Sequence, residues 1–216
     1  RPPRSTLFPY TTLFRSFASC LFSAANAPVD PIDLGADRLY LSLQGANDEK
    51  TVRKLLYIYN DDVRKRALFH AVILGNVDIV AKILHYGIFS PGDLEKIVHP
   101  DWRWTTILSA AVGNENQNNG HKIIKLLLDY GVDPNIVDEN GDTALMEAAS
   151  GGEKECVEVL LDDPRTNSTL ENRDKRTALD VAKIYSSKYR GDPEKSARGA
   201  MIETLLLNHR NKNSHN

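Results

Sequence analysis

The sequence predicts an all-α solenoid, in which helix-turn-helix units joined by short β-hairpins stack on one another. The first observation is a Leu-x-x-Ala core that recurs four times, with its leucines 40, 37 and 34 residues apart. The second is an i, i+3, i+4 apolar pattern after each core, which is typical of an amphipathic helix. Repeats of this length bury their apolar faces by stacking. The aligned leucines are Leu68, Leu108, Leu145 and Leu179.

The composition is that of an ordinary folded protein and excludes several classes. Of the 216 residues, 41% are hydrophobic and 26% are charged, which excludes wholesale disorder. A net charge of -2 gives no support for binding nucleic acid. The chain lacks a run of 18 apolar residues, so we expect no membrane span in its body. Two cysteines can supply neither a disulfide scaffold nor a Cys-rich zinc site.

The first 16 residues are interpreted as an assembly artefact. Residues 6–16 read TLFPYTTLFRS, which matches the translation of a common short-read sequencing adapter. We therefore exclude residues 1–16 from fold reasoning and expect the true N-terminus to lie outside the printed sequence. The alternative is a semi-apolar N-terminal arm.

Residues 17–27 resemble the end of an export signal. An apolar stretch up to Phe22 is followed by small residues, with small-x-small cleavage patterns ending at Ala25 and Ala27. This predicts an exported protein, periplasmic or secreted. Two alternatives remain: a degenerate lipoprotein box ending at Cys20, and an unstructured leader on a cytoplasmic protein. If the signal is cleaved, Cys156 is the one remaining cysteine and no internal disulfide can form.

Local signals place the ends of the helices. Thr143 and Thr177 stand where a side-chain hydroxyl caps the following helix, and Asp180 lies at capping-box distance from Thr177. Gly87 and Gly131 each follow a second helix, where we expect left-handed glycines to end it. Near the C-terminus we expect a polar insertion at 185–198 and a last helix at about 200–207.

The best copy of the unit resembles the ankyrin-repeat family. It combines an Asn-Gly hairpin, a Thr-Ala-Leu core, a Gly turn and a Val-x-x-Leu-Leu second helix within residues 138–161. The resemblance covers about residues 34–208, although Thr-Ala-Leu-Met and Thr-Ala-Leu-Asp replace the family's usual Thr-Pro-Leu-His tetrapeptide. It implies four to five repeats with hairpin fingers. We assign residues 28–210 to this domain and 211–216 to a polar tail. The units are expected near 34–63, 64–101, 102–137, 138–171 and 172–210.

Motifs for catalysis and cofactor binding are absent from the sequence. It contains no GxGxxG or Walker-type glycine loop, no GxSxG elbow and no HExxH pair. His70, His85, His99 and His121 fall in separate places without i, i+4 partners, so structural roles are expected for them. Cys156 is predicted to be a packed, inert thiol. We therefore expect no enzyme activity, no catalytic residues, no metal and no cofactor.

The resemblance implies instead a scaffold that binds a protein partner on its concave face. On the best copy, the family's contact positions fall in the finger and the first helix: Glu139, Asn140, Asp142, Met146, Glu147 and Ser150. The partner's identity cannot be deduced from such a fold. We expect a monomer. The alternatives are a cytosolic adaptor and a substrate-recruiting fragment of a larger enzyme.

Two insertions and an uneven charge add to this expectation. The first insertion, 89–104, contains Trp102, Arg103 and Trp104, residue types that are enriched at binding hot spots. The alternative to a binding role is that the two tryptophans cover the apolar core of the repeat. The second, around 114–121, is expected to be a flexible loop. Residues 138–163 hold nine acidic residues against one lysine, and from Arg173 onward basic residues outnumber acidic ones ten to five. This asymmetry can steer a partner, or it can reflect ordinary solvated helix faces.

Overall fold

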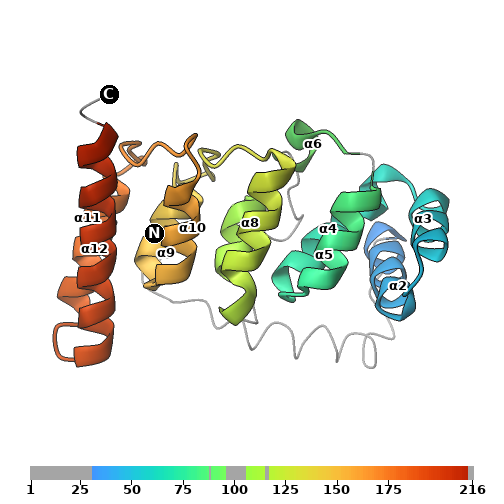
Figure 1. Ribbon diagram of the computed structural model, residues 1–216, viewed down its shortest axis with the longest axis horizontal. Coiled ribbons are helices and arrows are strands. Elements are labelled where there is room, and N and C mark those ends of the chain that lie inside the picture. Colours follow the sequence, from blue (N-terminus) through green and yellow to red (C-terminus); the bar gives the residue numbers. More distant parts are fainter. Residues whose placement is uncertain (1–30, 88, 96–105, 115–116, 214–216) are drawn as a thin grey trace.

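The computed structural model describes residues 31–87, 89–95, 106–114 and 117–213, and these form one row of stacked helices (Figure 1). Helices from the start of the described chain lie at one end of the row and the last two lie at the other. The all-α solenoid is thus confirmed. Within these ranges β-structure is limited to one antiparallel bridge, between Val137 and Thr143. The expected artefact (1–16) and signal remnant (17–27) lie outside the described residues.

The helices come in pairs, with two short elements between them. The pairs are α2 (Pro31–Gly45) with α3 (Glu49–Ile58), α4 (Asp61–Ile73) with α5 (Val77–Tyr86), α7 (Ile107–Val112) with α8 (Gly120–Tyr130), α9 (Ala144–Gly151) with α10 (Lys154–Asp162), and α11 (Ala178–Lys188) with α12 (Pro193–Asn213). The short elements are α6 (Pro91–Glu95) and the 3₁₀ turn η1 (Gln117–Asn119). The predicted loop at 114–121 is thus partly helical, because it contains η1 and the start of α8.

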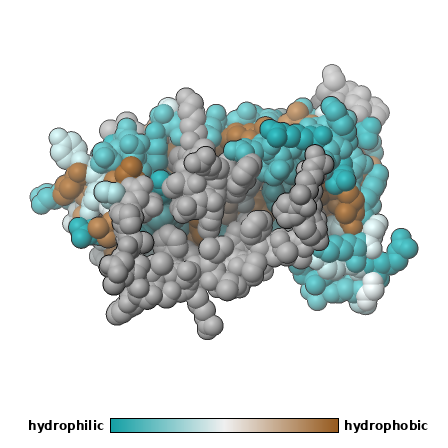
Figure 2. Space-filling model, turned by 180° about the vertical axis from the view of Figure 1, so that it is seen from behind, coloured by the Kyte–Doolittle hydropathy of each residue, from teal (hydrophilic) through white to brown (hydrophobic). Residues whose placement is uncertain are grey.

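The Leu-x-x-Ala cores lie where successive first helices meet. Leu145 is 2% exposed and Ala148 is fully buried on α9, which packs against α7 on one side and α11 on the other. The alanine lets the neighbouring helix approach closely, whereas a larger side chain would hold it away. The buried apolar side chains form a single cluster from Ala36 to Leu206. Exposed apolar residues appear as patches over both ends of the row (Figure 2).

Side-chain caps start six of the described helices, including the two predicted at Thr143 and Thr177. The Thr143 hydroxyl accepts a hydrogen bond from the backbone N–H of Met146 at 3.3 Å. Thr177 and Asp180 form the reciprocal capping box. Since these caps satisfy N–H groups that have no partner inside the helix, they fix where α9 and α11 begin.

Two expectations about helix ends need correction. Gly131 ends α8 with a φ of 104°, as predicted, but Gly87 has a φ of -77° and is not left-handed. A β-carbon on Gly87 would lie 2.3 Å from the Ile83 carbonyl oxygen and 2.6 Å from the Phe89 ring. A glycine is therefore needed at position 87 because a β-carbon would overlap these neighbours, and not because the backbone is left-handed. The insertion expected at 185–198 is mostly helical, because α11 runs to Lys188 and α12 begins at Pro193.

Gly152 is the point where the turn of one unit touches the next. Its φ is 72°, and an added β-carbon would lie 2.4 Å from the ring of Tyr185 on α11. We predict that Gly152→Ala lowers the free energy of unfolding by about 2–4 kcal/mol, from left-handed strain and steric overlap together. Urea unfolding followed by circular dichroism measures this.

Gly191→Ala is the matched control, because its β-carbon would meet nothing within 4 Å. It should change the free energy of unfolding by less than about 0.5 kcal/mol. Equal effects of the two substitutions would contradict the packing described here.

Candidate functional site

The finger at residues 138–142 is a turn organised by one aspartate. The Asp138 carboxylate accepts hydrogen bonds from the backbone N–H groups of Asn140 and Asp142, both at 2.8 Å. Gly141 takes a φ of 79°, a conformation that a glycine adopts without strain. The bridge between Val137 and Thr143 closes the turn directly before α9. The sequence Asp-Glu-Asn-Gly-Asp therefore builds the finger from its own side chains.

A second finger, residues 172–176, repeats this design. Asn172 takes the role of Asp138, since its side-chain oxygen accepts from the N–H groups of Asp174 and Arg176, both at 3.0 Å. Lys175 has a φ of 60°, close to that of Gly141. Asn172 lies 34 residues after Asp138, which is the spacing of the last two aligned leucines.

Two hydrogen bonds join the fingers side by side. The Asn172 amide donates to the Asp142 carboxylate at 2.6 Å, and the backbone N–H of Arg173 donates to the Asn140 carbonyl at 3.0 Å. A β-carbon at Gly141 would lie only 3.1 Å from the Arg173 nitrogen, so glycine permits this approach. The fingers consequently form one connected ridge beside the first helices.

Three carboxylates meet beneath the ridge. One carboxylate oxygen from each of Asp138, Asp142 and Glu147 lies within 4.8 Å of the others, and we call these residues the carboxylate cluster. Burial, with the charges of Asp142 and Asp138, raises the pKa of Glu147 to about 7. Burial also raises the pKa of Asp142, although the hydrogen bond from Asn172 opposes this. No Lys or Arg in the described ranges forms a direct ion pair with the cluster, although the charge of Arg176 acts on Asp142 from the second finger.

The three carboxylates lie close enough together to contact one metal ion through one oxygen each. Carboxylate oxygens are ligands that calcium and magnesium accept, and calcium takes about six to eight oxygens, so further ligands would have to come from water or a partner. What the arrangement can do is attract positive charge at a surface, where burial strengthens the attraction.

Comparison with known families bears on this part of the chain. Residues 108–189 match a family model described as ankyrin repeats, in three copies. This part of the chain belongs to the ankyrin-repeat family. The match includes α7 to α11 and therefore both fingers, while the pairs before it stack in the same row. Among the described helices of the array, none is long and apolar enough to cross a membrane.

Five of the six predicted contact residues of the ankyrin unit lie at the surface. Glu139, Asn140 and Ser150 are exposed, while Asp142 and Glu147 are partly buried. Met146 is 2% exposed and packs in the core, so it supports α9 from below and offers no surface to a partner. The predicted residues Trp102, Arg103 and Trp104 lie outside the described residues.

Sequence reasoning missed the link between the fingers. Asn172 is 9% exposed, and it joins the second finger to the Asp142 carboxylate. The signal was available, because the 34-residue spacing aligns Asn172 with Asp138, and both side chains have oxygens that can accept from a turn. The raised pKa of Glu147 had no such signal, since it depends on burial.

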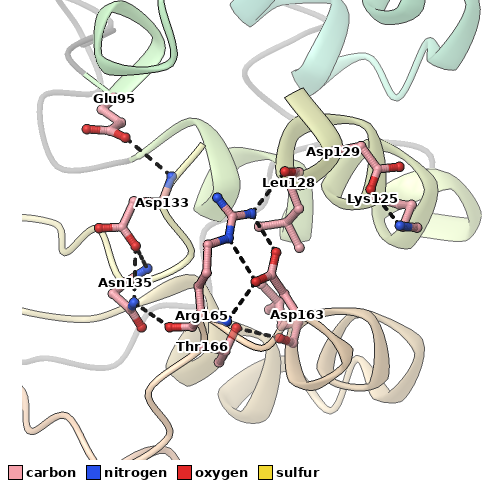
Figure 3. A network of polar contacts seen from close by, with 10 residues as sticks. Glu95, Lys125, Leu128, Asp129, Asp133, Asn135, Asp163, Arg165 and Thr166 are labelled. Atoms are coloured by element: carbon pink, nitrogen blue, oxygen red, sulfur yellow. Dashed lines mark hydrogen bonds and ion pairs between the residues drawn. The ribbon is translucent and has the colours of Figure 1, made fainter. Parts of the chain in front are cut away.

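A separate polar network joins the loops of neighbouring ankyrin units (Figure 3). The Arg165 guanidinium donates to the Leu128 carbonyl at the end of α8 and also to the Asp163 carboxylate, both at 2.9 Å. Hydrogen bonds from Arg165 hold the pKa of Asp163 below its usual value. Asn135 donates to the Arg165 carbonyl and accepts from the Asn167 N–H, each at 2.8 Å. This network fixes the loops that carry the fingers.

Arg165 should therefore contribute to stability across the unit boundary. We predict that Arg165→Ala lowers the free energy of unfolding by about 1–2 kcal/mol, because the Leu128 carbonyl keeps only the Gly131 N–H as its donor and the Asp163 carboxylate loses the guanidinium. Arg165→Lys should recover part of the loss, since a lysine lacks the guanidinium fork. Urea unfolding measures both variants.

Lys125→Ala provides the comparison for a solvated cation. Lys125 pairs with Asp129 across one helical turn, and both side chains are more than half exposed. Such pairs contribute about 0.5 kcal/mol or less. An Arg165→Ala loss no larger than this would show that the network does not hold the units together.

Cys156 is predicted to be chemically inert in the folded array. It is 3% exposed at the start of α10, and burial raises the pKa of its thiol to about 12. In a Cys20→Ser chain, labelling with an aromatic disulfide at pH 8 should be at least about a hundredfold slower than in urea, because little thiolate is present. Equal rates in both conditions would contradict the burial of this thiol.

Proposed function

We propose that this ankyrin array binds a protein partner, without catalysis, on the face formed by its fingers and first helices. The observation that carries the proposal is the carboxylate cluster, which gathers three acidic side chains without a direct ion pair among the described residues, beside an exposed finger ridge. Ankyrin repeats are in general protein-interaction modules. A cluster of this kind favours a partner that brings positive charge.

The fingers are already ordered in the free chain. Asn172 and Arg173 bond the second finger to the first, and Asp138 holds the first turn closed. Binding to a preformed ridge requires little further ordering, so more of the contact energy remains as affinity.

Apolar side chains beside the cluster refine the expected partner. By the 34-residue spacing, Glu147 and Ser150 of α9 correspond to Val181 and Ile184 of α11. Ile184 is 49% exposed, and so is Val137 at the base of the finger. The face therefore offers negative charge next to apolar surface. We infer that the partner presents a segment in which Lys or Arg alternates with apolar residues.

A selection experiment tests this inference. Peptides displayed on phage are selected on the purified chain, and the affinities of the selected peptides are measured by fluorescence anisotropy. We predict enrichment of Lys and Arg together with apolar residues. The double variant Asp142→Asn/Glu147→Gln should bind these peptides at least about tenfold more weakly, because a desolvated charge contact is lost.

The matched control changes two carboxylates on the second helix. Glu155 and Glu158 lie on α10, and Glu155→Gln/Glu158→Gln removes the same charge from that helix. This control should keep its affinity within about twofold. If both double variants bind the selected peptides alike, or if the selected peptides are acidic, the proposed face is wrong.

Export is proposed from the sequence of residues 17–27 alone. Determining the complete upstream reading frame tests it. Lys or Arg codons shortly before Phe17 support export, whereas a long upstream domain supports the alternative of a substrate-recruiting fragment. An upstream frame with neither feature favours the cytosolic adaptor.

A further inference from the structure

Asp142 links the two fingers to each other next to helix α9. Its backbone N–H and carbonyl close the first turn onto Asp138, and its carboxylate accepts the hydrogen bond from Asn172 of the second finger. The Glu147 carboxylate approaches from α9. We call this contact, made of the cluster and Asn172, the finger joint.

We propose that the finger joint is a pH-sensitive contact, which is closed while the carboxylate cluster holds a proton and loosens when that proton leaves. The physical reason is burial of the Glu147 carboxylate together with repulsion from its two neighbours, since both favour the protonated form. Without the proton, three negative charges share a space in which their oxygens lie within 4.8 Å of one another, partly shielded from water. This property belongs to the folded chain alone, and it goes beyond partner binding.

The surroundings do not neutralise the cluster. The charges that act on Glu147 are those of Asp142 and Asp138, and both are negative. From the second finger, Asp174 adds to the repulsion on Asp142 while Arg176 opposes it. Helix α7, which packs against α9, contains no ionisable side chain. Ionisable groups of the other packed helices, α10 and α11, do not contribute to the shift at Glu147.

Movement of the Asp142 carboxylate is the step that would loosen the joint. Asp142 can relieve the repulsion by turning away from Glu147, but its carboxylate is the acceptor for Asn172. Moving it breaks that bond and strains the neighbouring one, from the Arg173 N–H to the Asn140 carbonyl. The backbone amides of Asp142 and Arg173 therefore report on the joint.

The expected size follows from linkage. The pKa of Glu147 is about 7 in the closed joint and 4.5 ordinarily. Because the folded value is raised, the stabilisation is complete below pH 4.5 and is lost as the pH rises through 7. Between pH 6 and pH 8, the open fraction should rise about tenfold, because the open joint both admits water to Glu147 and separates it from Asp142, so that its pKa returns to the ordinary value.

Hydrogen exchange tests the proposal on the full chain. Exchange at the Asp142 and Arg173 amides is followed by NMR at pH 6, 7 and 8 and corrected for the intrinsic pH dependence of exchange. We expect protection to fall about tenfold from pH 6 to pH 8. Glu147→Gln, which removes the titrating group at nearly constant size, should keep high protection at every pH.

Two comparisons make the outcome decisive. The Val132 amide, which donates to the Leu127 carbonyl in the buried end of α8, should show constant protection. Glu155→Gln on α10 should retain the pH dependence of the wild-type joint. Constant protection at Asp142 and Arg173 in the wild-type chain would overturn the proposal. So would a Glu147→Gln chain with an unchanged pH dependence.

Discussion

Close packing between successive first helices is the constraint on which the rest of the structure depends. The contact is possible because an alanine, three residues after each core leucine, leaves room for the next backbone. Gly152 imposes a similar condition at the turn, where the ring of Tyr185 from the next unit fills the space that a side chain would need. Once this spacing is set, the fingers of adjacent units lie near enough to bond.

The polar parts of the molecule follow from that spacing. Asp138 and Asn172 each organise a turn with one side-chain oxygen, and the regular stack brings the two turns together. The same closeness gathers three carboxylates, which form no direct ion pair with a Lys or Arg among the described residues. An ordered surface with concentrated negative charge is thus a result of the repeat geometry.

Much of the fold was predictable because its signals are periodic and local. The Leu-x-x-Ala spacing identified the first helices, and Thr177 with Asp180, three positions apart, identified a helix start. Errors arose where a residue's role depends on how side chains pack in three dimensions. Gly87 was expected to end its helix in a left-handed conformation, but a glycine is required there because the Phe89 ring and the Ile83 carbonyl lie against it. The expected polar insertion at 185–198 is mostly helical, since α12 gains its support from α11 and α10.

The candidate site was predictable only in outline. The contact positions implied by the family resemblance pointed to the finger and to α9. They gave no sign that the Met146 side chain faces the core. The pKa of Glu147 depends on burial and on two neighbours, so it could not be deduced from residue order.

The row of units also has a mechanical consequence. Among the described helices, each end pair packs on its neighbour more extensively than the middle pairs pack on one another. A pulling force along the row would therefore part it first between the α4–α5 pair and the α7–α8 pair, where the described contact is smallest, and lengthen the molecule in steps. A tethered array of this kind behaves as an extensible spring whose softest junction lies inside the row.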